Sequence, residues 1–116
     1  MEVLWNPDRL IPHRLEAVRG VIPRLVAGGL TREDPAHIVT PAMVDVRFTQ
    51  IGPLDLVRSD VFVTVLARRE VERQHSAADL ASEWAAAVAA ASGVSDAVVE
   101  LVLTDHTSSF DYGSLE

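Results

Sequence analysis

One stretch of the chain, residues 61–102, limits most strictly what it can fold into. Residues 61–66 form an apolar, largely β-branched run that predicts a strand, and the alanine-rich residues 76–92 predict a helix. Gly93 predicts a tight exit from that helix, and residues 97–103 predict a second strand. A strand, a helical crossover and a strand form a βαβ unit, which favours two parallel strands with the helix across one face.

The boundary between the first of these strands and the helix is predicted from charge and capping. Residues 67–75 carry three arginines and are expected to form a solvated turn. Ser76 followed by Asp79 is close to a capping box, which predicts that the helix begins at Ser76.

The first half of the chain reads as a looser copy of the same unit. Residues 2–6 predict a short strand, residues 12–28 carry apolar positions at helical spacing, and residues 43–51 alternate as a half-buried strand does. Pro23 predicts a kink or a break in the helix, and Gly28-Gly29 predicts its end.

The two units together predict an α/β (α+β) fold made of duplicated β-α-β units. We expect one domain, residues 1–116, with pseudo-repeats 1–57 and 58–116 and a four-stranded mixed sheet with both helices on one face. The other face carries apolar positions that two helices cannot reach, which predicts an oligomer. The order βαββαβ also describes a ferredoxin-like fold, so a dimer of the cofactorless monooxygenase type stays open as an alternative.

Composition and charge argue against several classes of function. Ten basic against seventeen acidic residues give a net charge of −7, which argues against nucleic acid or a membrane surface as the partner. The absence of cysteine excludes disulfides, thiolate nucleophiles and sulfur-ligated metals. The four histidines are scattered and no glycine-rich phosphate loop occurs, so we expect neither a metal site nor a cofactor. No run suits a membrane span, and a cytoplasmic location is expected.

The repeated β-α-β organisation, the exit Ser92-Gly93-Val94-Ser95-Asp96 into an apolar strand, and the exit Gly28-Gly29-Leu30 resemble the tautomerase superfamily. The resemblance is to its double-length members, macrophage migration inhibitory factor and 5-carboxymethyl-2-hydroxymuconate isomerase. It implies a homotrimer in which three sheets form a central barrel with the helices outside. It also implies cofactor-independent isomerisation of a small oxo or enol acid in active sites between subunits, with an N-terminal proline moving the proton.

The sequence departs from that pattern at its first residues. Glu2 stands where the resemblance calls for the proline, and because Glu2 is not small, Met1 is expected to be retained. The amine of Met1 and the carboxylate of Glu2 are therefore candidate catalytic groups, although Glu2 is equally well an exposed first-strand residue. His106 after Asp105 is a third candidate, with a surface turn as the alternative because neighbouring extended residues point to opposite sides.

The candidate substrate-binding residues are arginines and C-terminal aromatics: Arg47, Arg68, Arg69, Arg73, Phe110 and Tyr112. The resemblance implies that arginines after the third strand hold a carboxylate by paired hydrogen bonds, while solvated charges are the alternative and the favoured interpretation for two of the three. Arg47 is expected to pair with Asp45 or Glu100 as a buried arginine. The two aromatics are expected to close a pocket between subunits or to pack on a partner purely for assembly.

Three functions fit these observations. The first is a tautomerase-like enzyme that isomerises a small oxo or enol acid without a catalytic proline. The second is a catalytically inactive trimeric binding or assembly protein of the same fold. The third is the ferredoxin-like monooxygenase type, which would be a dimer rather than a trimer.

Overall fold

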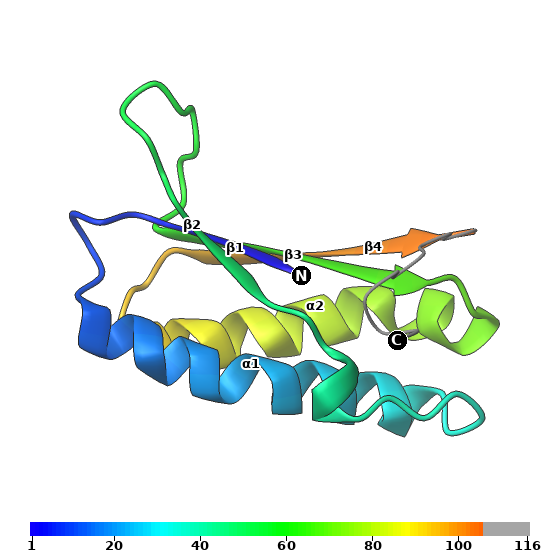
Figure 1. Cartoon of the computed structure of the whole chain (residues 1–116). Helices are drawn as coiled ribbons and strands as arrows, with labels where there is room; N and C mark the ends of the chain where they lie inside the picture. The colour runs from blue at the N-terminus through cyan, green and yellow to red at the C-terminus, as the bar shows by residue number, and fades with distance from the viewer. Residues whose placement is uncertain (106–116) are drawn as a thin grey trace, which may run out of the picture.

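The computed structural model describes residues 1–105 as a four-stranded sheet with two long helices packed on one face (Figure 1). The elements follow in the order β1 (Glu2–Trp5), α1 (Pro12–Glu33), a 3₁₀ turn η1 (Pro41–Met43), β2 (Arg47–Gln50), β3 (Val61–Arg68), α2 (Val71–Ser92) and β4 (Ala97–Thr104). Among the described residues, no helix is long and apolar enough to cross a membrane.

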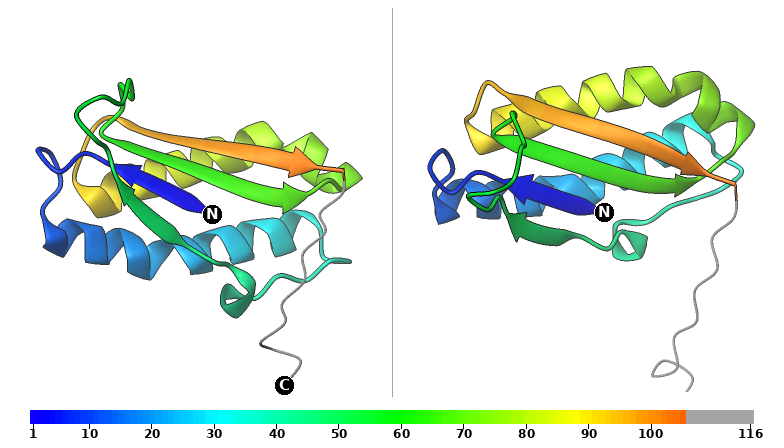
Figure 2. Two further views of the ribbon diagram at one scale, coloured as in Figure 1. Left: turned by 45° about the horizontal axis from the view of Figure 1, so that its top comes forward. Right: turned by 90° about the horizontal axis from the view of Figure 1, so that it is seen from above.

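The sheet has the strand order β2-β1-β3-β4, seen from above in Figure 2. β1 runs parallel to β2, β3 runs parallel to β4, and the two pairs meet antiparallel between β1 and β3. The predicted mixed sheet of two β-α-β units is therefore confirmed. The ferredoxin-like alternative is wrong, because in a split βαβ a strand of the other unit separates each parallel pair, whereas here the paired strands are direct neighbours.

The core lies between the sheet and the two helices. Along β3 the side chains of Val61, Val63 and Val65 are buried under the helices, while Phe62 and Thr64 on the other face are only partly covered. The helices close this core with apolar side chains at helical spacing, which are Val18, Ile22, Val26 and Leu30 of α1 and Leu80, Trp84 and Val88 of α2.

Helix α1 is longer than the sequence predicts. It passes through Gly28 and Gly29 and ends at Glu33, and it is continuous across Pro23, so the predicted end at Gly28-Gly29 is wrong. Gly29 instead permits close helix packing, because a Cβ atom there would lie 2.8 Å from Trp84 Nε1 and 3.0 Å from Leu80 Cδ2. Burial of one face of α1 against the core outweighs the local preference of glycine for a helix end.

Helix α2 begins earlier than predicted. Its N-cap is Glu70, which makes no side-chain capping hydrogen bond, so the predicted start at Ser76 and the predicted turn over residues 71–75 are wrong. Arg68 and Arg69 before the helix are exposed, as expected for solvated charges. The predicted exit is confirmed, because Gly93 adopts φ 75° and its amide donates to the carbonyl of Ala89 at 2.9 Å.

Strand β2 is shorter than predicted, since the chain before Arg47 is taken up by η1 and a connecting segment. The alternation that predicted the strand is confirmed. Val46 and Phe48 are partly buried, while Asp45, Arg47 and Thr49 are exposed.

The face of the sheet away from the helices is open and partly apolar. The loop of residues 51–60 projects from the strands on that side (Figure 1). Leu54 and Leu56 in this loop are 93% and 98% exposed. The loop is braced internally, because the Gly52 amide donates to the Asp55 carboxylate at 2.6 Å and the Asp55 amide donates to the Gly52 carbonyl. This turn encloses Leu54, and Leu56 follows directly after it.

Candidate functional site

Two hollows meet at Met1, one on each face of the sheet. The hollow on the helix side, which we call the N-terminal cleft, has a volume of about 330 Å³; Met1, Asp45, Arg68 and Arg73 contribute its polar lining, and the rest is apolar. The hollow on the open face, which we call the outer hollow, has a volume of about 310 Å³ and is lined by Glu2 and Arg47 among others. Met1 lines both hollows. The start of β1 therefore lies between a cleft lined by two arginines and a hollow lined by the Glu2–Arg47 ion pair.

The start of the chain is fixed by its pairing with the segment before β2. The Met1 ammonium donates to the carbonyl of Asp45 at 2.8 Å, and the Arg47 amide donates to the Met1 carbonyl at 2.9 Å. These bonds extend the parallel ladder of β1 and β2 back to the first residue. The amine therefore has a defined position at the rim of the N-terminal cleft.

Glu2 and Arg47 lie directly opposite one another on the two parallel strands. Arg47 Nη2 is 3.3 Å from Glu2 Oε2, and their side chains are 79% and 41% exposed. The sequence-based expectation of a buried Arg47 paired with Asp45 or Glu100 is wrong, because β2 is an edge strand and its outward side chains reach solvent. An ion pair this exposed adds little stability, so Glu2 keeps an accessible carboxylate.

Arg73 is buried, contrary to the predicted solvated turn. It lies in the first turn of α2, where Nη1 donates to the carbonyl of Arg68 at 2.9 Å and Nε is 3.6 Å from Asp34 Oδ2. Asp34 is the C-cap of α1 and is 1% exposed. Within the described residues Arg73 Nε has no hydrogen-bond partner. Arg73, which lines the N-terminal cleft, is thus a buried cation beside a buried carboxylate.

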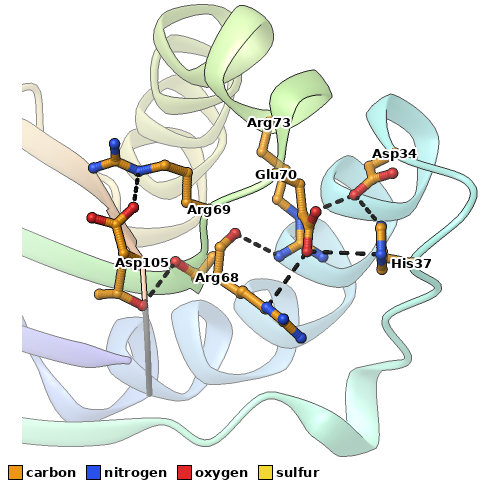
Figure 3. A network of polar contacts seen from close by, with 9 residues as sticks. Asp34, His37, Arg68, Arg69, Glu70, Arg73 and Asp105 are labelled. Atoms are coloured by element: carbon orange, nitrogen blue, oxygen red, sulfur yellow. Dashed lines mark hydrogen bonds and ion pairs between the residues drawn. The ribbon is translucent and has the colours of Figure 1, made fainter.

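Figure 3 shows that this pair belongs to a larger network. His37 Nδ1 is 2.9 Å from Asp34 Oδ2, and its Nε2 is 3.7 Å from Glu70 Oε1. Arg68 Nε is 3.6 Å from the same Glu70 oxygen. Ligand atoms of Asp34, His37 and Glu70 lie within 4.8 Å of one another. Each carboxylate also faces a guanidinium, so the contacts among the described residues form an ion-pair network.

Sequence patterns alone did not identify Asp34, His37 or Glu70. The only local signal is the three-residue spacing of Asp34 and His37 past a helix end, which is common in loops. Glu70 and Arg73 join them only because the start of α2 folds beside the end of α1.

Of the remaining predicted residues that the structure describes, Arg69 does not join this site. Arg69 lines neither hollow; its Nε is 2.9 Å from Asp105 Oδ1, and its amide donates to the carbonyl of Thr104. The predicted residues His106, Phe110 and Tyr112 lie outside the described residues.

Another hollow lies on the open face, at the opposite end of the strands from Met1. It has a volume of about 380 Å³, and its lining includes Leu4, Leu56, Phe62, Val98 and Arg58. Among the residues that the structure describes, no candidate catalytic or substrate-binding residue lines it. Its apolar lining belongs to the exposed sheet face and its projecting loop.

Comparison with known proteins identifies the fold. The wild-type symmetric trimer of the Q0 fused 4-OT protein matches with a TM-score of 0.61 at 19% identity, over 89% of this chain and 83% of that chain. N1, a member of the cis-3-chloroacrylic acid dehalogenase family, matches with a TM-score of 0.57 at 14% identity, over 97% of this chain and 79% of that chain. No protein-family model and no curated protein matches the sequence. This chain shares its fold with both solved structures.

Proposed function

We propose that this protein is a tautomerase-like enzyme that moves a proton on a small oxo or enol acid without a catalytic proline. The observation that carries the proposal is the N-terminal cleft, where Met1 shares one hollow of about 330 Å³ with Arg68 and Arg73. Two guanidiniums suit a carboxylate, and the apolar remainder of the lining suits a short carbon skeleton.

In the proposed reaction the arginines hold the substrate carboxylate and a group at the start of β1 moves the proton. The Met1 amine is the better candidate, because it borders the arginine-lined cleft while Glu2 lines only the outer hollow. A base must lie within hydrogen-bond reach of the proton it takes. The hydrogen bond from the amine to the Asp45 carbonyl gives the amine a fixed orientation for this role. Glu2 is the second candidate, with Arg47 holding its carboxylate in place.

We also propose that the protein works as a homotrimer. The open face of the sheet exposes Leu66 and Val98, and the loop beside it exposes two leucines almost completely. Exposed apolar surface of this kind marks an interaction site. The symmetric trimer of the Q0 fused 4-OT protein, which shares this fold, supports an assembly of three copies.

A second candidate function is a trimeric binding protein without catalysis. The Met1 ammonium is already hydrogen-bonded and Glu2 is already paired with Arg47, so both proton-transfer candidates have partners in this structure. The same arginine-lined cleft would then bind a carboxylate without converting it.

The experiment that separates these functions is a tautomerisation assay with phenylenolpyruvate and 2-hydroxymuconate, monitored by ultraviolet absorbance. The protein used is first shown by intact mass to retain Met1. Turnover above the buffer rate supports the enzyme. Saturable binding of phenylpyruvate without turnover supports the binding protein. Absence of both contradicts the proposed ligand class.

Two neighbouring arginines provide a matched pair for testing carboxylate binding. We expect Arg68→Gln to weaken substrate binding roughly 10- to 100-fold, the usual size of a lost charge-assisted hydrogen bond. Arg69→Gln is the control. It removes the same charge at the next residue, and the Arg69 side chain lines neither hollow. Equal effects of the two substitutions would contradict the assignment. Glu2→Gln and acetylation of the amine then distinguish the two proton-transfer candidates.

A further inference from the structure

We propose that His37 is a positioning residue that controls how available Arg68 and Arg73 are to an anion in the N-terminal cleft. The contacts that carry this inference are independent of the reaction. Its consequence for substrate binding rests on the proposed function.

The inference starts from two oxygen atoms that are each shared between His37 and an arginine (Figure 3). Asp34 Oδ2 faces both His37 Nδ1, at 2.9 Å, and Arg73 Nε, at 3.6 Å. Glu70 Oε1 faces both His37 Nε2, at 3.7 Å, and Arg68 Nε, at 3.6 Å. The imidazole therefore competes with one arginine at each end of the ring, and both of these arginines line the cleft.

The distances show whether His37 or the arginine lies closer to each shared oxygen in this structure. His37 is within hydrogen-bond distance of Asp34 Oδ2, whereas Arg73 Nε is not and has no other hydrogen-bond partner among the described residues. Both guanidinium contacts to the carboxylates are longer than a hydrogen bond. Small changes at His37 can therefore change what each guanidinium contacts.

Protonation of the ring is the change to which this arrangement is suited. A neutral imidazole donates from one nitrogen, and an imidazolium donates from both. The charged groups that face His37 are Asp34 at the end of α1 and Glu70 before α2, with Arg68 of β3 and Arg73 of α2 on the far side of those carboxylates. A protonated His37 takes a larger share of both carboxylates, so both guanidiniums become freer to bind an anion. The affinity of the cleft for a carboxylate then rises as the pH falls.

Nuclear magnetic resonance of the arginine Nε–H groups tests this directly, without any substrate. In the wild type we expect the Nε–H signals of Arg68 and Arg73 to shift with pH at the same midpoint as the ring signals of His37. In His37→Gln we expect that pH-dependent shift to be lost. His13→Gln is the matched control, because His13 is exposed at the other end of α1, and it should leave the shift intact. Arginine signals that stay still while His37 titrates, or that still shift in His37→Gln, would overturn the proposal.

A second variant separates the two ends of the ring. In Glu70→Gln the shared carboxylate between His37 and Arg68 is gone, so the Arg68 signal should lose its pH response while the Arg73 signal keeps it. Loss of both responses, or of neither, contradicts two separate shared oxygens. Turnover is measured on the same samples. A wild type that is inactive but whose arginine signals shift together with those of His37 refutes the proposed reaction alone. A wild type that is active but whose arginine signals do not follow His37 refutes this inference alone.

Discussion

At the scale of single residues, the absence of a side chain at Gly29 sets how closely the two helices pack. Gly29 is buried against Trp84 and Leu80, and Trp84 is 1% exposed. The indole Nε1 has no hydrogen-bond partner among the described residues, so its apolar contacts must outweigh an unmet donor. Gly28, one residue earlier, is exposed, and a Cβ atom added there would have nothing within 4 Å.

These neighbouring glycines should respond to alanine in opposite directions. Gly29→Ala should lower the free energy of unfolding by about 1–3 kcal/mol, because a methyl group there overpacks a full core. Gly28→Ala should raise it by about 0.5–1 kcal/mol, because alanine loses less backbone freedom in a helix. Urea denaturation measures both values. A neutral or stabilising Gly29→Ala would show that Trp84 moves aside more easily than the close contact implies.

At the scale of elements, polar contacts between α1 and α2 flank the buried seam. Arg32 Nη2 is 2.8 Å from Glu83 Oε2, and Ser76 donates to Glu33 at 3.0 Å. The hydrogen bond from Arg32 lowers the pKa of Glu83, and the hydrogen bonds to Glu83 and Glu33 raise the pKa of Arg32. Both side chains are exposed, so this contact orients the helices more than it stabilises them.

The lowered pKa of Glu83 predicts the pH dependence of this contact. A carboxylate with a depressed folded-state pKa adds stability above its ordinary value of 4.5, and that stability is lost as the pH falls through the lowered value. A double-mutant cycle of Arg32→Gln and Glu83→Gln should therefore give a small favourable coupling at neutral pH that disappears below that range. Urea denaturation at each pH measures it. A coupling that persists in acid would contradict an origin in the Glu83 charge.

At the scale of the whole molecule, helices cover one face of the sheet, and within residues 1–105 none covers the other face. The open face carries Leu66, Val98 and the projecting leucines of the loop after β2. A chain of 12.6 kDa that leaves this surface in water is expected to associate through it.

The loop leucines should decide whether the proposed trimer forms. We expect the wild type to have about three times the 12.6 kDa mass of the chain by light scattering, and Leu54→Ser with Leu56→Ser to shift it toward one chain. Val71→Ser is the matched control, because Val71 is 60% exposed but lies at the start of α2 on the helix side. A monomeric wild type would refute the trimer, and a double variant that stays trimeric would refute the role of the loop.

Much of the fold follows from local patterns, and much of the site does not. The alternation around Phe48, the apolar run from Val61 and the glycine exit at Gly93 all predicted the observed structure, because each depends on neighbours in sequence. The prominent Arg68-Arg69 pair was visible in sequence, but its two members separate in space: Arg68 lines the cleft and Arg69 pairs with Asp105. Which arginine lines a cleft depends on strand and helix ends that local charge does not define.

The sequence by itself determined the repeated β-α-β order and the apolar faces, since hydrophobic periodicity and glycine geometry act over a few residues. The tertiary structure alone decided that α1 continues past Gly28-Gly29, that α2 begins at Val71 and that Arg73 is buried beside Asp34. The physical reason is that burial energy is gained only when distant segments meet, and it can override a local preference worth about 1 kcal/mol. The N-terminal cleft forms only where these distant segments pack together.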